Sequence, residues 1–352
     1  MKKFLILSIA ALSGQVHGDC ALLRGCGTHS LSTAPISVMG DHLHKQGEWM
    51  FSFRHMHMDM DGMYNGSNSV SPSAVHAANY VVSPTRMIME MQMLGAMYAP
   101  SDDLTLMAMI SYIQNDMDHV IEAGTPLVGL NNGSDTFSTR SVGMADLKLS
   151  ALFRLMQKES HHVHASFGIS LPTGTISNTD IAPGPGGRLS RQLPAAMQPG
   201  SGTFDLLPSL TYLYHGSEWS AGVQARGVFR TGENHHNYRM GHRAEVDAWF
   251  GCKPFNWLSV NSGLGLRWEG ELDGTQSDVI QNPPFAPTRR LVPTVFGGNY
   301  GGMQLDAMVG INLLVAQAHR VGLDVRVPLW QDVNGYRLGQ DVTATIGWST
   351  SF

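Results

Sequence analysis

Apolar and polar residues alternate one by one through the last twelve residues of this chain. From Val342 to Phe352 the even-numbered positions hold Val, Ala, Ile, Trp, Thr and Phe, whereas the odd-numbered positions hold Thr, Gly or Ser after an initial Asp341. Successive side chains of a β-strand point to opposite sides, so this pattern predicts a strand with one apolar and one polar face. A strand of about ten residues is long enough to cross a membrane.

The same alternation recurs along the chain in segments of similar length. In a soluble protein the apolar face of each segment would pack on a core, whereas in a membrane barrel it would face lipid and the polar face would line the lumen. The expected strands lie near 48–58, 86–98, 103–114, 141–156, 161–172, 203–215, 218–231, 238–251, 256–270, 300–316, 319–330 and 338–352.

The linkers between these strands decide between the two folds because short and long ones alternate. Short linkers lie at 99–103, 157–160, 216–217, 252–255 and 317–318, and long ones at 59–85, 115–140, 173–202 and 271–299. Outer-membrane barrels have short periplasmic turns and long external loops. The linkers at 232–237 and 331–337 are brief although they fall on the external side. We therefore predict an all-β protein, a transmembrane antiparallel up-and-down β-barrel of about 12 strands, in the outer membrane of a Gram-negative bacterium.

The N-terminus is expected to direct export. Lys2 and Lys3 precede a short apolar run, and small residues up to Gly18 suit cleavage, so residues 1–18 are predicted to be a signal peptide. Residues 19–47 would form a periplasmic tail or a plug in the lumen, and residues 48–352 the barrel. Cys20 also allows a lipoprotein, although Asp19 occupies the position where a small residue is expected.

Export into an oxidising compartment also shapes the interpretation of the cysteines. Cys20 and Cys26 are close in sequence and are predicted to form a local disulfide. Cys252 falls at a strand end and is expected to be a small apolar residue. The net charge is −5 and no basic tract is present, which argues against nucleic acid as a partner.

Four short motifs in the predicted barrel share the pattern of one family. They are Ala145–Leu149 with Phe153–Leu155, Ser170–Thr175, Gly202–Leu206 followed by Pro208 and Leu210, and Tyr238–Gly241. These motifs resemble the outer-membrane proteins grouped with the meta-pathway of phenol degradation, from about residue 48 to the end of the chain. The resemblance implies a transporter-like barrel for passive passage of small solutes, hydrophobic or aromatic in class.

The resemblance carries over no catalytic residue, and the chain has no Gly-x-Ser-x-Gly elbow, so we do not expect an enzyme. The terminal aromatic Phe352 resembles the signal that the barrel assembly machinery reads. Expected partners are therefore outer-membrane lipid, that machinery and a small solute.

A stretch rich in histidine and methionine opens the first long loop. His55, Met56, His57, Met58, Met60 and Met63 lie within nine residues. Thioether sulfur suits Cu(I), and imidazole also binds copper, so these residues are a candidate site for Cu(I) or Ag(I). The alternative is a polar start of a loop without metal, and no other cofactor is expected. The row Met87, Met89, Met91 and Met93 alternates with polar residues, which predicts a lipid-facing stripe.

The polar faces of the expected strands carry many charges that are predicted to line the lumen. Charges within a barrel wall must face water or one another, so the lumen is either a water-filled pore or a network of ion pairs. A barrel of about twelve strands is narrower than the open porins, which favours a narrow or partly plugged passage. A structural barrel without transport is the third interpretation. The predicted lumen residues are Arg54, Glu90, Asp146, Lys148, Arg154, Arg226, Arg243, Glu245, Asp247, Arg267, Glu269, Asp306, Asp324 and Arg326.

Overall fold

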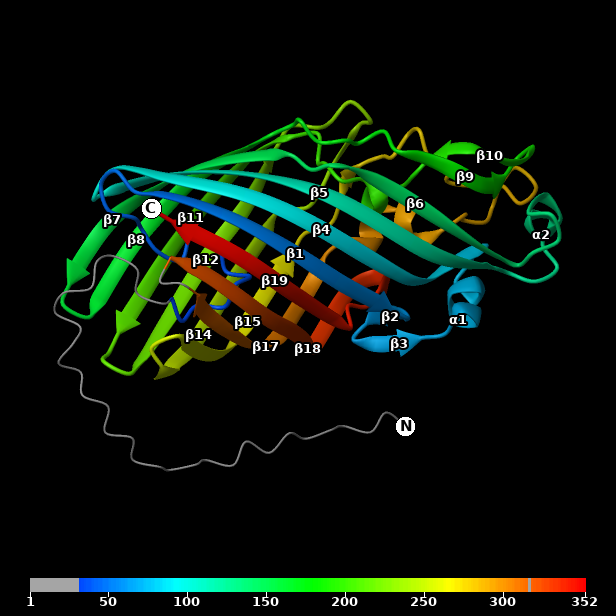
Figure 1. The fold of residues 1–352 in the computed structure, drawn as a ribbon. Helices are drawn as coiled ribbons and strands as arrows, with labels where there is room; N and C mark the ends of the chain where they lie inside the picture. The colour runs from blue at the N-terminus through cyan, green and yellow to red at the C-terminus, as the bar shows by residue number, and fades with distance from the viewer. Residues whose placement is uncertain (1–31, 316–317) are drawn as a thin grey trace. The chain divides into compact units, whose positions relative to one another are not determined.

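A computed structural model describes residues 32–315 and 318–352, in which twelve antiparallel strands close into a barrel (Figure 1). Each wall strand pairs with its neighbours in the chain, and the pairing of β1 with β19 completes the ring. The predicted fold class is therefore confirmed. The wall strands are β1 (Trp49–Asp61), β4 (Val82–Ser101), β5 (Leu104–Ile121), β7 (Leu147–Lys158), β8 (His161–Leu171), β11 (Phe204–His215), β12 (Trp219–Thr231), β14 (Arg243–Phe255), β15 (Leu258–Glu269), β17 (Gly302–Val315), β18 (His319–Leu338) and β19 (Val342–Ser351).

The first and last strands of the barrel pair with each other. Antiparallel pairing joins β1 to β19, from Met50 opposite Ser351 to Asp59 opposite Val342. The backbone of Trp49 exchanges two hydrogen bonds with that of Phe352, with N–O distances of 2.9 and 3.0 Å. The closing strand therefore removes the last free edge of the sheet, which would otherwise leave backbone groups unpaired in lipid.

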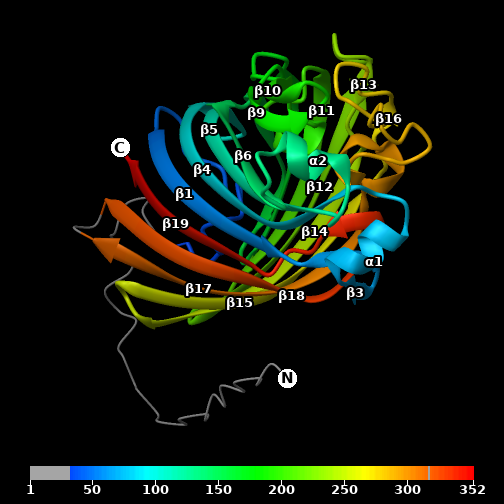
Figure 2. The same cartoon turned by 90° about the vertical axis from the view of Figure 1, so that its right-hand side faces the viewer.

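The long connections gather at one end of the barrel, opposite the short turns and the C-terminus (Figures 1 and 2). Within the described part of the chain, no helix is long and apolar enough to cross a membrane. The elements of the long connections are β2 (Met63–Gly66), β3 (Asn68–Val70), α1 (Pro72–Ala77), α2 (Pro126–Leu130), β6 (Thr136–Met144), β9 (Thr179–Gly184), β10 (Gly187–Gln192), η2 (Ala195–Met197), β13 (Tyr238–Arg239), β16 (Asp273–Gly274), η3 (Pro293–Val295) and η4 (Gly297–Asn299).

The segment expected as one strand over 141–156 is divided into β6 and β7, and both pair with β5. The division falls at Ala145 and Asp146. The Asp146 carboxylate accepts hydrogen bonds from the backbone N–H groups of Gly174 and Ser201, at 2.9 and 2.8 Å. These bonds tie the wall to the loop that follows β8, which accounts for the interruption.

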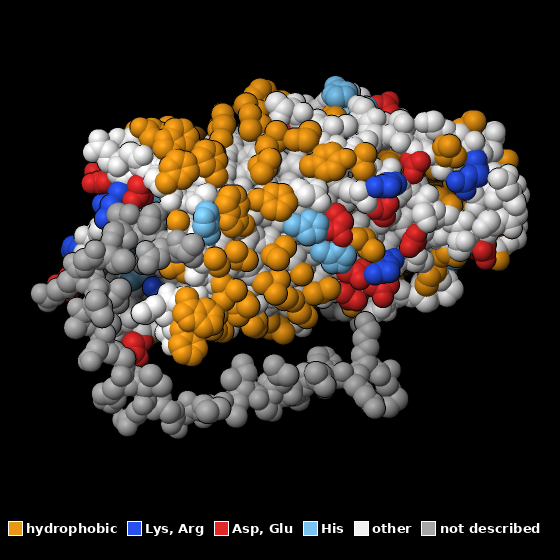
Figure 3. Space-filling view, viewed as in Figure 1, with side chains coloured by type: hydrophobic (Ala, Val, Ile, Leu, Met, Phe, Trp, Pro, Cys, Tyr) orange, Lys and Arg blue, Asp and Glu red, His pale blue; other side chains and the backbone are white. Residues whose placement is uncertain are grey.

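On most of the wall strands, alternation separates an apolar outer surface from a polar interior. Large apolar side chains such as Leu94, Leu264 and Ile346 are exposed, whereas Asn312 and Asp324 on neighbouring wall strands are buried. Apolar side chains cover much of the outer face between the two ends (Figure 3). This is the inverse of a soluble protein and matches a wall that faces lipid.

Residues 32–46, here called the lumen segment, enter the half of the barrel that carries the short turns, and only the last two, Lys45 and Gln46, are exposed. The backbone carbonyl of Ala34 accepts from Asn312 on β17 at 3.1 Å and from Arg320 on β18 at 2.6 Å. On other sides of the ring, Gly40 contacts His164 of β8, with Nε2 2.8 Å from the carbonyl oxygen, and Met39 accepts from Gln224 of β12 at 3.0 Å. Contacts to several sides of the ring place this segment across the lumen. The predicted signal peptide and the predicted Cys20–Cys26 disulfide lie outside the described residues.

Candidate functional site: the lumen and its external pocket

The centre of the lumen holds a network of ion pairs that joins three strands. Arg226 of β12 contacts Glu245 and Asp247 of β14, with N–O distances of 2.7 and 3.1 Å. Arg326 of β18 contacts the same two carboxylates at 3.4 and 2.9 Å. The paired registers place Arg226 opposite Glu245 and Gln224 opposite Asp247, so these side chains share the inner face. The network therefore matches a packed lumen rather than an open pore at this level.

A second network lies nearer the external loops. Glu269 of β15 contacts Arg243 of β14 and Arg337 of β18, each at 3.1 Å. Arg267, two residues before Glu269 on β15, donates to Gln304 at 2.6 Å and to Gln340 at 2.9 Å. This network holds three guanidinium groups against one carboxylate, whereas the central network holds two of each. The lumen therefore carries both signs of charge, with an excess of positive charge nearer the external loops.

Glu90 is the exception among the predicted lumen residues, because it lies on the outer face of β4. It is paired with His57 and His55 on β1, and its Oε2 lies 3.0 Å from His55 Nε2. It shares its side of the strand with exposed Leu94. Inner-face positions, or the buried break after β6, hold Arg54, Asp146, Lys148, Arg154, Arg226, Arg243, Glu245, Asp247, Arg267, Glu269, Asp306, Asp324 and Arg326.

The methionine row on β4 faces the lumen, so the expectation of a lipid-facing stripe is wrong. Met87 and Met93 are 4% and 6% exposed, whereas Leu94 beside them is 58% exposed. Two physical causes reverse the expected faces. The external half of β4 extends past the apolar band, so its outer face is polar, and apolar loops fill the lumen on its inner side.

The six predicted metal ligands do not come together. Strand alternation turns His55 and His57 outward, toward Glu90, and turns Met56, Met58 and Met60 inward. Met63 lies on β2 and packs in an apolar cluster with Met87 and Met117. Among the described residues, no three His, Cys, Asp or Glu side chains gather in a metal-binding group.

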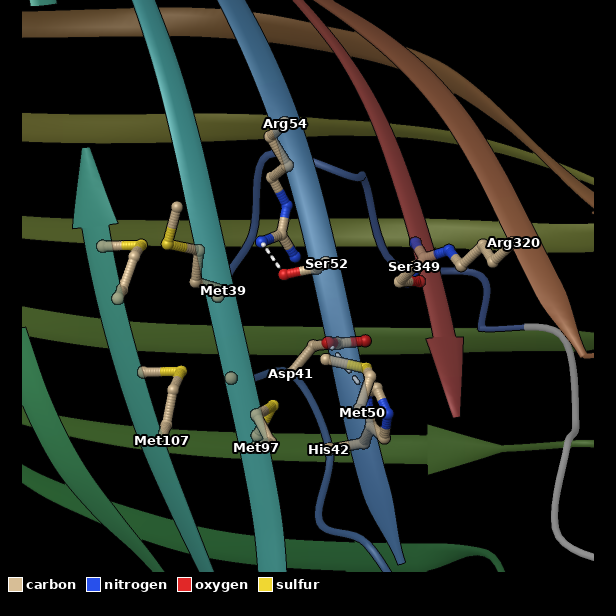
Figure 4. A pocket seen from close by; sticks show the side chains of 13 residues that line it. Met39, Asp41, His42, Met50, Ser52, Arg54, Met97, Met107, Arg320 and Ser349 are labelled. Carbon is tan, nitrogen blue, oxygen red and sulfur yellow. Dashed lines mark hydrogen bonds and ion pairs between the residues drawn. The ribbon is translucent and has the colours of Figure 1, made fainter. Parts of the chain in front are cut away.

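A small cavity lies where the lumen segment passes the inner face of β1, β4 and β5. It has a volume of about 20 Å³ and is lined by methionines of the wall and by Met39, Asp41 and His42 of the lumen segment (Figure 4). The pKa of Asp41 lies well below its ordinary value: burial raises it, but the neighbouring His42 and Arg320 outweigh that effect. The sequence did not predict this cavity, because the position of residues 32–46 inside the barrel is not encoded in any local pattern, and the methionine row on β4 was expected to face lipid. The only available signals were the methionine density and the histidines before the first strand.

External loops close the other end of the lumen through apolar clusters. One cluster joins Met87 and Met117 of the wall to Val75, Leu193 and Met197 of the loops. Another contains Tyr238 and Tyr300, and burial raises the pKa of Tyr238 to about 12. The loops are therefore packed against the wall and are not open arms in solvent.

Within these loops lies a larger pocket of about 290 Å³, here called the external pocket. It lies between the outer ends of β4 and β5, the β9–β10 hairpin and the loop after β16. The ring of Phe137 stacks on His119 at its edge, with centroids 4.6 Å apart. Polar or charged residues, among them Thr139, Arg191 and Asp278, make up seven of the nineteen that line it. The apolar lining includes Met117, Phe137, Leu193, Met197, Leu291 and Val292.

No protein-family model and no curated protein matches the chain. Among solved structures, an outer membrane channel from Pseudomonas putida F1 aligns with a TM-score of 0.59 and 13% identity, covering 90% of this chain and 100% of that one. The toluene transporter TodX of Pseudomonas putida has a TM-score of 0.40 and 8% identity over 87% of this chain and 90% of its own. The KdgM porin reaches 0.38 at 8% identity, with coverages of 86% and 99%. The last two values are too low to carry an argument, whereas the first shows that this chain has the fold of an outer-membrane channel.

Proposed function

We propose that this protein is a non-catalytic outer-membrane channel for passive passage of small solutes. The external pocket is the observation that carries the proposal. A concave site with an apolar lining and a few polar groups is the usual form of a small-molecule site. Its volume of about 290 Å³ suits a small hydrophobic or aromatic molecule. The resemblance to proteins grouped with the meta-pathway of phenol degradation supports the same class of solute, and membership of that group is part of the proposal.

Passage requires movement, because both ends of the lumen are filled. The external loops pack on the wall around Met87 and Met117, and the lumen segment crosses the periplasmic half. A solute would bind first in the external pocket and then pass when the segment shifts. The lumen carries charges of both signs, which would give no strong preference between anions and cations.

Export and assembly complete the proposal. Residues 1–18 would be removed as a signal peptide, and the outer membrane would be the destination, as the apolar outer surface supports. The assembly machinery would recognise the last strand with its terminal Phe352. The pairing of β19 with β1 supports this role, because closure of the ring depends on that strand.

Flux into liposomes tests the channel. Purified full-length protein is reconstituted, and uptake of a small aromatic solute is followed together with ionic conductance in planar bilayers. Ala182→Trp would fill the external pocket and is expected to slow uptake severalfold, because Ala182 lines it. Ile181→Trp is the matched control, since Ile181 is the exposed neighbour on the same hairpin.

Absence of both flux and current in the wild type would reject the channel and favour a barrel without transport. Equal slowing in the two tryptophan variants would reject the external pocket as the solute site.

A further inference from the structure

The inner faces of β1, β4 and β5 form a wall of thioethers. Met50, Met97 and Met107 are direct partners across the three strands, and their row lies nearest the periplasm. Further rows toward the loops add Met109, Met93, Met56, Met91, Met58, Met89, Met60, Met87 and Met117. Leucine would fill an apolar interior equally well, so packing alone does not require this choice of residue.

The small cavity at the periplasmic end of this wall brings in donors from another element. Five methionines line it: Met39 from the lumen segment and Met50, Met97, Met107 and Met109 from the wall. Figure 4 shows Met39, Met50, Met97 and Met107 around one space that also contains Asp41 and His42. A volume of about 20 Å³ holds one ion or one water and no organic solute.

The imidazole of His42 has one ring nitrogen held by a carboxylate, as metal-binding histidines usually do. Its Nδ1 lies 2.9 Å from Asp41 Oδ1, which leaves Nε2 available as a ligand. Ser32 donates to the other oxygen of Asp41 at 2.8 Å and fixes the carboxylate. A carboxylate behind the second ring nitrogen is the usual outer partner of a metal-bound histidine.

The donor set and the local charge select the kind of ion. Arg54 and Arg320 also line the cavity, and their guanidinium groups donate to the carbonyl oxygens of Ile36 and Ala34, respectively. Two positive charges against the single carboxylate of Asp41 disfavour a divalent ion. Thioether sulfur is a soft ligand that selects soft monovalent ions such as Cu(I). The bonds between sulfur and such an ion are largely covalent, so the ion needs little negative charge from its ligands.

We propose that this cavity, here called the methionine cavity, binds one Cu(I) or Ag(I) ion through the thioethers of Met50, Met97 and Met107 and through Nε2 of His42. Met39 and Met109 complete its wall. The site goes beyond the proposed channel and does not rest on it. It also differs from the six-residue site expected from sequence, because His55 and His57 lie outside the barrel and take no part.

Titration with Ag(I) tests the proposal without redox chemistry. The full chain is purified in detergent and nitrate buffer, with Cys20, Cys26 and Cys252 replaced by serine so that thiols do not compete. Calorimetry gives stoichiometry and affinity, and X-ray absorption gives the donor atoms. We expect one tight site per chain with a sulfur shell and one nitrogen.

Two triple variants locate the ion. Met50→Leu with Met97→Leu and Met107→Leu preserves side-chain volume but removes three donors, so stoichiometric binding should be lost. Met87→Leu with Met89→Leu and Met91→Leu removes as many methionines from the other end of the wall and should keep the wild-type affinity. Asp41→Asn weakens the support of His42 and removes the only carboxylate that lines the cavity, so it should weaken binding by about 10- to 100-fold.

Absence of a stoichiometric site in the wild type would overturn the proposal. Equal affinity in the two triple variants would do the same, whether both bind or both fail. If the first triple variant does not fold, unchanged affinity in Asp41→Asn and in His42→Gln overturns it. A chain that conducts solutes but binds no silver would refute this site and leave the channel standing.

Discussion

Arg326 of β18 donates to Asp247 of β14 across two intervening strands, with Nη1 2.9 Å from Oδ1. Asp247 is 1% exposed and also accepts from Arg226 of β12 at 3.1 Å. The pair therefore joins wall strands that share no backbone hydrogen bonds. An ion pair of this kind resists flattening of the barrel's cross-section. Without Arg326, the buried Asp247 carboxylate keeps only the contact with Arg226.

Arg326→Met should lower the free energy of unfolding by roughly 3 kcal/mol, because it breaks a buried ion pair and keeps the other partner in place. Urea titration of the protein in lipid vesicles measures the change. Arg86→Met is the control, since Arg86 pairs with Asp59 on the exposed outer face. An equal loss in both variants would contradict a special role for the lumen pair.

Removal of the lumen segment should widen the passage. Deletion of residues 32–44 eliminates the contacts of Ala34, Met39 and Gly40 with the ring, so single-channel conductance should rise. Replacement of the same residues by a glycine–serine linker of equal length should have a similar effect, because the anchoring contacts are lost there too. Unchanged conductance in both would show that this segment does not limit passage.

The outer face of β4 changes from lipid to water between two adjacent outward positions. Leu94→Arg places a charge in the apolar band and should cost roughly 2–4 kcal/mol of folding free energy in bilayers. Gln92→Arg should cost much less, because Gln92 already lies beside His55, with Nε2 3.2 Å from Nδ1. Urea titrations in lipid vesicles compare the folding free energies of the two variants. Equal losses would contradict a membrane boundary between Gln92 and Leu94.

Phe352→Ser should reduce the amount of assembled barrel in cells but leave refolding in vitro nearly intact. The backbone bonds between residue 352 and Trp49 persist, so closure itself remains possible. Phe51→Ser is the matched control, because it removes the same stacked pair, whose ring centroids lie 5.9 Å apart, and retains the terminal aromatic. Similar cellular yields for both variants would argue against recognition of Phe352.

The alternating pattern and the spacing of the linkers were sufficient to predict the architecture. Each strand of the wall overlaps the segment expected from alternation, since period-2 patterning is a local property of the chain. The break at Asp146 was not predictable, because it depends on hydrogen bonds to Gly174 and Ser201 in a distant loop.

By itself the sequence determined a barrel and the two faces of every strand, but only the tertiary structure decided which face of β4 points inward. Glu90 was expected inside and Met93 outside, and the reverse holds. Polarity identifies the lumen face only where a strand lies within lipid and the lumen is wet. Here loops and the lumen segment supply an apolar interior, while the outer ends of the strands stand in water. The methionine cavity arises from the same cause, because Met39 and His42 come from a segment without any pattern of its own.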